Sequence, residues 1–227
     1  MSFQNVAAVS ISAAALLAFA GPTHATVYVN SQAAYNAAAP TAVLIEDFEA
    51  TGQASDTAIY ASFSHNGVGY LGLAGSPAPN LFISSAGYTN YGAGVGPTTS
   101  KILTANGDES FVVTFASAVS AFGFDAYFNG LGPTTLKAFN GTTLLDSVTT
   151  ANAFDFKGHL GVAGVGPITS FTWVTTAGGQ LNTGIDNLTT AQAIPEPATW
   201  ALMVAGCAGL AGMARGRSRR QTDVRAD

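Results

Sequence analysis

Acidic side chains gather at two places in this 227-residue chain, and their types suit the binding of a cation. Glu46, Asp47 and Glu49 stand close together, and Asp186 directly precedes Asn187 more than a hundred residues later. Calcium takes six to eight oxygen ligands from carboxylates, amides and carbonyls. We therefore name Glu49 and Asp186 as candidate calcium ligands. The alternative is that Glu46 and Glu49 are surface charges at a strand end and that Asp186 forms a turn.

A second set of residues has the chemistry to bind sugars. Aromatic rings stack on the faces of sugars, while amides and carboxylates hydrogen-bond their hydroxyl groups. Tyr88, Asn90 and Tyr91 stand together in a glycine-rich stretch and are the candidate ligand-binding residues. Tyr70 and Tyr127 are further candidates. The alternative is that half or more of these tyrosines pack at the edges of the fold.

The residue patterns favour a protein that is not an enzyme. His65 and His159 have no second histidine at metal-ligand spacing, and neither an H-E-x-x-H nor a G-x-S-x-G motif occurs. A pair such as Glu49 with Asp125 could serve glycoside hydrolysis, but no pattern places both at one site. Asp125 follows the apolar run Phe-Gly-Phe, where a buried carboxylate must be paired or hydrogen-bonded, and a structural role is favoured.

Short strands must position these side chains, since short apolar and β-branched runs separated by turn residues cover most of the chain. One helix is expected at 31–39, and Asn140-Gly141 is the best hairpin signal. About ten strands without a βαβ rhythm predict an antiparallel sandwich. The expected strands are Ala42–Phe48, Ala58–Phe63, Val68–Leu73, Leu81–Ser84, Ser110–Phe115, Val119–Phe128, Thr134–Phe139, Thr142–Thr149, Ile168–Thr175 and Ile185–Thr189.

The last 34 residues combine a short rigid motif, an apolar span and a basic cluster. Pro195, Glu196 and Pro197 precede the uncharged segment 198–214, whose 17 residues reach the lower limit for a transmembrane helix. The positive-inside rule places the following arginines in the cytoplasm. This tail resembles the PEP-CTERM sorting signal, which implies an exosortase-type membrane protease as a partner; the alternative is an ordinary C-terminal anchor. The arginines of the basic tail are Arg215, Arg217, Arg219 and Arg220.

The N-terminal segment has the layout of a secretory signal peptide. An apolar, alanine-rich stretch leads to Thr23-His24-Ala25, a small-x-small site for signal peptidase, although the segment before it lacks lysine and arginine. The expected organisation is a signal peptide at 1–25, a β-sandwich domain at 26–191, a linker at 192–197, a transmembrane helix at 198–214 and a basic tail at 215–227.

The region 26–194 has three lysines, no arginine and ten acidic residues, and only 9% of the whole chain is charged. Such a negative domain will not bind nucleic acid through charge. Its surface of glycine, alanine, threonine, serine and asparagine fits contact with glycans or an extracellular matrix better than a cytosolic enzyme.

Three short motifs also resemble a jelly-roll domain that often precedes PEP-CTERM tails. They are Glu46-Asp47-Phe48-Glu49, Phe122-Gly123-Phe124-Asp125 and Gly184-Ile185-Asp186-Asn187-Leu188. The resemblance implies an all-β, antiparallel jelly-roll-like sandwich related in shape to carbohydrate-binding domains. First and last strands often pair in jelly rolls, which would bring Glu49 and Asp186 together at a structural calcium site like that of carbohydrate-binding jelly rolls.

The expected function is that of an exported, exosortase-sorted and non-catalytic protein of the cell surface or exopolysaccharide matrix. It would pass transiently through the inner membrane and serve adhesion or association with extracellular polysaccharide. The alternatives are a purely structural, self-associating matrix protein and a secreted glycan hydrolase that uses Glu49, Asp125 or Asp186.

Overall fold

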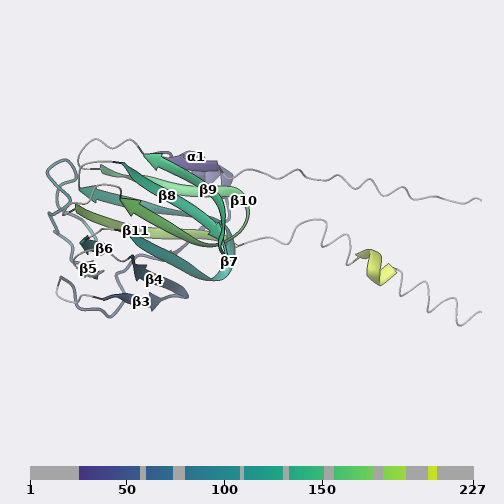
Figure 1. Ribbon diagram of the computed structural model, residues 1–227, viewed down its shortest axis with the longest axis horizontal. Helices are drawn as coiled ribbons and strands as arrows, with labels where there is room; N and C mark the ends of the chain where they lie inside the picture. Colours follow the sequence, from purple (N-terminus) through teal and green to yellow (C-terminus); the bar gives the residue numbers. More distant parts are fainter. Residues whose placement is uncertain are drawn as a thin grey trace, which may run out of the picture.

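Two long strands, β7 (Phe111–Asn129) and β10 (Phe156–Thr175), organise the computed structural model and pair antiparallel along most of their length (Figure 1). Their register shifts between Ala163 and Ile168, about halfway along the pair. Phe122 and Phe171 lie nine pairing steps apart along this ladder, or about 30 Å in a flat sheet. Their rings nevertheless stack at 4.3 Å. The sheet is therefore folded over on itself at the shift into two facing layers.

The first layer holds the second half of β7 and the first half of β10, with β11 (Leu181–Gln192) beside β7. The second layer holds the other halves of both long strands. The remaining strands of the first layer are β5 (Asn80–Ser84), β6 (Ile102–Gly107), β1 (Thr26–Val29) and β2 (Val43–Glu46). Those of the second layer are β3 (Ser62–His65), β4 (Val68–Gly72), β8 (Thr134–Asn140) and β9 (Thr143–Thr150).

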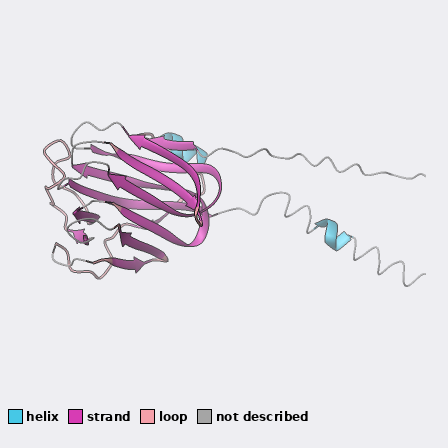
Figure 2. Ribbon diagram, in the orientation of Figure 1, coloured by secondary structure: helices cyan, strands magenta, loops and turns pink. Residues whose placement is uncertain are grey.

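The helix α1 (Gln32–Ala38) lies against β10 at one side of this strand framework (Figure 2). The structure describes residues 26–56, 60–73, 80–107, 110–129, 133–150, 156–175, 181–192 and 204–208. The last of these ranges is a short helical segment. Among the described residues, no helix combines the length and the apolar character needed to cross a membrane.

Aromatic side chains fill the space between the layers. Phe122 and Phe124 point inward from the first layer, and Phe171 and Trp173 point inward from the second, all at most 1% exposed. Phe171 stacks on both phenylalanines of the opposite layer, and Trp173 contacts Phe124 at 5.8 Å. Burial of such rings dominates the energetics of a core. The alternation of Phe122 with Phe124 and of Phe171 with Trp173 therefore marks the core faces of these strands.

The all-β antiparallel sandwich is confirmed, with some differences in its elements. The helix begins at Gln32, and Ser31 caps it without a side-chain hydrogen bond. Asn140 and Gly141 join β8 to β9, as predicted. The expected strands Ser110–Phe115 and Val119–Phe128 are instead the single strand β7, because β10 pairs with both across the irregularity. The first strand expected from the sequence corresponds to β2, and it pairs with the last strand, β11, as predicted. The strand β1, which the sequence did not predict, precedes it and pairs with β10.

Several predictions from the sequence lie outside the described residues. These are the signal peptide at 1–25, the Pro195-Glu196-Pro197 motif, the basic tail at 215–227 and most of the transmembrane helix at 198–214. They stay predictions.

Candidate functional site

The outer face of the first layer carries a row of ionisable side chains on three neighbouring strands. Asp186 on β11 pairs in register with Asp125 on β7, and Asp125 pairs with His159 on β10. Residues directly opposite one another in antiparallel strands have Cβ atoms about 5 Å apart, and like charges there are destabilising. We call Asp125, His159, Asp186 and the adjacent Asn187 the polar strip. A fold that keeps two carboxylates in this relation pays for it in stability, which marks the polar strip as a candidate site.

Helix α1 covers the face on one side of the polar strip. Its Tyr35 is 1% exposed and lies flat over Gly123 and Gly161, the next residues on this face of β7 and β10. A Cβ atom at Gly123 would lie 2.8 Å from the Tyr35 ring, and one at Gly161 would lie 2.6 Å from it. The Tyr35 hydroxyl also bonds Thr189 at 3.3 Å. We call this contact the Tyr35 seat: the ring fits against β7 and β10 because both strands have glycine, without a Cβ atom, at this point.

The loop between β5 and β6 covers the other side of the polar strip in the same manner. Its Tyr91 is fully buried and bonds Thr104 through its hydroxyl at 2.6 Å. A Cβ atom at Gly184 on β11 would collide with the Tyr91 hydroxyl. The Tyr91 ring packs against Tyr127 of β7 at 5.4 Å. Two tyrosines seated on glycines thus frame the polar strip.

An aromatic series continues from this frame toward solvent. The half-buried Tyr88 contacts Tyr91 edge-on at 5.5 Å, and the exposed Asn90 donates its amide to the Tyr88 hydroxyl at 3.2 Å. Lys157, exposed on β10, places its ammonium 5.3 Å from the centre of the Tyr127 ring. Burial raises the pKa of Tyr127 to about 12, and the charges of Asp186 and Asp125 add to the rise.

Asp186 is the buried acid of the polar strip, at 1% exposure. Its Oδ2 accepts a hydrogen bond from the Ser100 hydroxyl at 2.5 Å, and its Oδ1 accepts one from the Asn187 backbone N–H at 2.7 Å. Burial raises its pKa to about 6; the charges of Asp125 and Glu49 add to this rise, and the two hydrogen bonds oppose it. Asp186 therefore holds the loop at Ser100 and faces little solvent.

Asp125 is the accessible acid, with 30% of its side chain exposed. Its Oδ2 accepts the side-chain amide of Asn187 at 2.9 Å. Asn187 reaches it because it adopts a left-handed conformation (φ 51°) at a bulge in β11. Burial alone would raise the pKa of Asp125, but His159, the Asn187 amide and the charge of Lys157 outweigh burial and lower it. Asp125 is thus ionised at neutral pH.

His159 completes the polar strip with unused hydrogen-bonding capacity. It is 7% exposed, and neither ring nitrogen has a hydrogen-bond partner among the described residues. Its Nδ1 lies 3.7 Å from Oδ1 of Asp125, beyond hydrogen-bond range, and its ring packs on Tyr35 at 5.0 Å. A buried polar group without a partner costs about 1 to 3 kcal/mol, so His159 is an unsatisfied polar group directly beneath the accessible Asp125.

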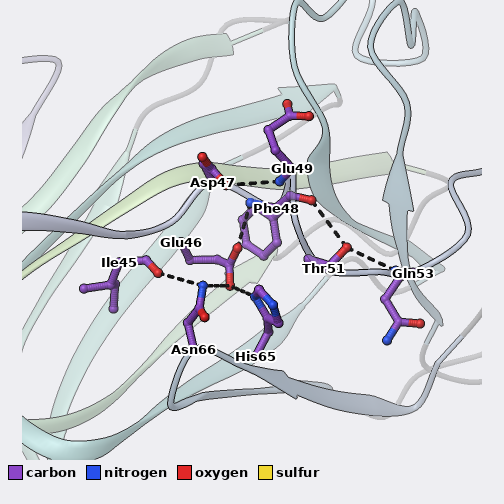
Figure 3. A network of polar contacts seen from close by, with 9 residues as sticks. All are labelled: Ile45, Glu46, Asp47, Phe48, Glu49, Thr51, Gln53, His65 and Asn66. Carbon is purple, nitrogen blue, oxygen red and sulfur yellow. Dashed lines mark hydrogen bonds and ion pairs between the residues drawn. The ribbon is translucent and has the colours of Figure 1, made fainter.

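Glu49 reaches this region because of a polar network at the preceding turn (Figure 3). The buried carboxylate of Glu46 accepts the backbone N–H of Phe48 at 2.7 Å, Nδ1 of His65 at 2.5 Å and the amide of Asn66 at 3.3 Å. These bonds hold Phe48 at a φ of 59°, with its ring in the core. The backbone consequently turns outward at Glu49, as the sticks in Figure 3 show.

Glu49 joins this turn to the end of the framing loop. Its Oε1 accepts the backbone N–H of Lys101 at 2.8 Å, and the Lys101 ammonium bonds the Glu49 carbonyl at 3.0 Å. Glu49 and Asp186 are close enough for their charges to interact, as the resemblance implied. Among the described residues, however, no three acidic, histidine or cysteine side chains form a group that could hold a metal. Calcium binding stays a prediction.

The structure separates the predicted sugar-binding residues. Asn90 is exposed and Tyr88 half-buried, but Tyr91 and Tyr127 are buried and Tyr70 lies in the core. The interpretation of Tyr91 as an exposed stacking ring is therefore wrong, because its hydroxyl and ring are used to seat the loop on Gly184. Sequence reasoning also missed His159; the alternation of Lys157, His159 and Gly161 with buried Leu160 was the available signal.

No family model and no curated protein matches this chain. Among solved structures, it is similar to a variant of a family 29 carbohydrate-binding module (14% identity, 69% of this chain and 99% of that one, TM-score 0.38). A family 11 carbohydrate-binding module of a cellulosomal cellulase from Clostridium thermocellum matches at 12% identity, with 69% and 97% covered and a TM-score of 0.32. A Stig cyclase from Fischerella sp. TAU matches at 11% identity, with 67% and 100% covered and a TM-score of 0.42. These likenesses are partial in shape and slight in sequence, so function has to be read from the site.

Proposed function

We propose that this chain is an exported, non-catalytic glycan-associating protein that binds its ligand at the polar strip. The observation that carries the proposal is Asp125, an ionised and 30% exposed carboxylate beside the buried His159, whose ring nitrogens have no hydrogen-bond partner among the described residues. Sugar hydroxyls donate hydrogen bonds, so they can pair with this accessible carboxylate.

The surroundings of the polar strip support a sugar as the ligand. The side chain of Asn187 within the strip is exposed, and the framing loop presents the exposed Asn90 and the half-buried Tyr88 next to Tyr91. Tyr35 and Tyr91 are packed on glycines, so the frame is rigid before a ligand arrives. Preorganisation of this kind lowers the entropy lost on binding.

A binding role is favoured over hydrolysis by the state of the two acids. Glycoside hydrolysis requires two carboxyl groups that flank the scissile bond. Asp186 is 1% exposed and both of its oxygens accept protein hydrogen bonds, so it is poorly placed to contact a substrate. Asp125 has the exposure that contact requires, whereas the exposed Glu49 already accepts the Lys101 backbone N–H through Oε1.

Export and sorting form the second part of the proposal. The signal-peptide-like segment 1–25 would deliver the chain, and the apolar segment 198–214 would hold it in the inner membrane until an exosortase-type protease cuts near Pro195–Pro197. Release would place the sandwich at the cell surface or in the exopolysaccharide matrix. The composition of the domain supports this location, since a weakly charged surface suits contact with polysaccharide.

A second candidate function is self-association without a defined ligand. The outer face of the second layer supports it, because it includes a cross-strand row with an exposed apolar side chain. One row runs through Leu71, Val112 and Thr172, and Leu71 is 48% exposed. A protein that assembles through this face would show no sugar selectivity.

The test is a glycan array with the full chain in mild detergent, in calcium and again in chelator. Saturable binding to defined glycans that Asp125→Asn weakens, while Asp146→Asn on β9 does not, would support the proposal. Loss in chelator would add the predicted calcium. A folded chain that binds no glycan in either condition would overturn glycan binding and leave self-association.

A further inference from the structure

The charged groups around the polar strip differ in whether they already have a partner within the protein. Three carboxylates face this region, from Asp125, Asp186 and Glu49, and three basic side chains accompany them, from Lys101, Lys157 and His159. The Lys101 ammonium is held by the Glu49 carbonyl at 3.0 Å, and the Lys157 ammonium lies over the Tyr127 ring. Both lysines thus have local partners.

Among the described residues, Oδ1 of Asp125 is an acceptor of this set that receives no hydrogen bond. The Asn187 amide bonds the other oxygen, Oδ2, and the nearest imidazole nitrogen stands 3.7 Å from Oδ1. Asp186, directly opposite on β11, adds a second carboxylate at the same point of the sheet. A cation at Oδ1 would relieve this opposition of like charges, whereas an anion there would increase it.

Resting on the proposed function, we propose that the polar strip selects glycans that carry free amino groups, namely amino-sugar polymers, over neutral and acidic ones. The ammonium of such a sugar donates to Oδ1 of Asp125, and a neighbouring hydroxyl bonds the exposed side chain of Asn187. A charge-assisted hydrogen bond supplies the selectivity. A uronic-acid polymer is rejected because its carboxylates meet Asp125 and Glu49.

Three chitin-derived or pectin-derived hexamers of equal length test this selectivity: fully deacetylated glucosamine, N-acetylglucosamine and galacturonate. Each is titrated calorimetrically into the full chain in mild detergent at neutral pH and low salt. The glucosamine hexamer should bind about tenfold more tightly than its acetylated form, and galacturonate should not bind. Oligolysine serves as a cation without sugar hydroxyls and should bind weakly.

The variants Asp125→Asn and Asp146→Asn complete the design. The amide in Asp125→Asn can still accept the Asn187 hydrogen bond, so the variant should keep its fold and bind both chitin-derived hexamers about equally. Asp146→Asn lies on the other layer and should retain the preference. Equal binding of both hexamers by the unaltered chain would overturn the selectivity but leave glycan binding intact. Binding of oligolysine as tight as that of glucosamine would also overturn it, and binding of no hexamer would overturn glycan binding itself.

Discussion

The seat of Tyr35 on Gly161 predicts a sharp stability effect. In Gly161→Ala, the new Cβ would stand 2.6 Å from Cδ2 of Tyr35 and 3.1 Å from two further ring atoms. Ordinary carbon contacts are 3.5 to 4.0 Å, so the ring has to move by about 1 Å. It cannot simply slide, because Gly123 supports its other edge and the ring is 1% exposed. Overpacking of this kind costs about 1 to 3 kcal/mol.

A double-mutant cycle separates this clash from other effects. Tyr35→Ala alone should cost about 3 kcal/mol, as for removal of a large buried ring. In that background, Gly161→Ala should become neutral or stabilise by up to about 1 kcal/mol, because alanine suits a strand better than glycine. The difference between the two backgrounds gives a coupling energy of about 1 to 4 kcal/mol between two residues far apart in sequence.

Urea unfolding of the full chain, followed by circular dichroism, measures the four free energies of unfolding. Gly166→Ala is the matched control, since a Cβ atom there meets nothing within 4 Å. It should change stability by less than about 0.5 kcal/mol. Additive effects of Tyr35→Ala and Gly161→Ala would refute the packing of Tyr35 on Gly161. They would also refute the role of Tyr35 in bordering the polar strip.

Three further predictions concern other parts of the chain. The pKa of Asp186 rises from 3.8 to about 6 on folding. Its charged form therefore destabilises the fold as pH rises from about 4 to 6, by up to about 3 kcal/mol, and Asp186→Asn should remove this pH dependence of the unfolding free energy. Glu46→Gln leaves fewer acceptors for the donors of Phe48, His65 and Asn66 and should cost about 2 to 3 kcal/mol in urea unfolding; an unchanged midpoint would contradict the anchoring role. Deletion of Ala198–Asp227 should leave the sandwich folded but abolish sorting, so equal surface retention of truncated and full-length chains in fractionated cells would refute the sorting signal.

The elements of the sandwich were predictable because their signals are local. The alternation of Phe111, Val113 and Phe115 reports one buried face of a strand within five residues. Asn140-Gly141 specifies a tight turn because its residues tolerate positive φ, and Gly141 has a φ of 57°. The acidic clusters were also visible, and Glu49 and Asp186 do interact, as the pairing of first and last strands suggested.

The polar strip was not predictable, because its members meet only through register. Asp125, His159 and Asp186 are separated by dozens of residues, and a shift of one residue in either pairing would turn one of them to the core. The burial of Tyr91 likewise depends on a residue that is distant in sequence. Its glycine-rich surroundings predicted an exposed loop, but Gly184 on a distant strand offers the space that buries it.

Patterning of apolar and turn residues along the chain was enough to specify an all-β sandwich, its core phenylalanines and its hairpins, since strand periodicity and turn chemistry act over a few residues. The assembly of the candidate site required three strands in register, a bulge at Asn187 and two tyrosines seated on glycines. These are relations between distant segments, and they arise only when the layers close on a common core and the loss of chain entropy is offset by burial.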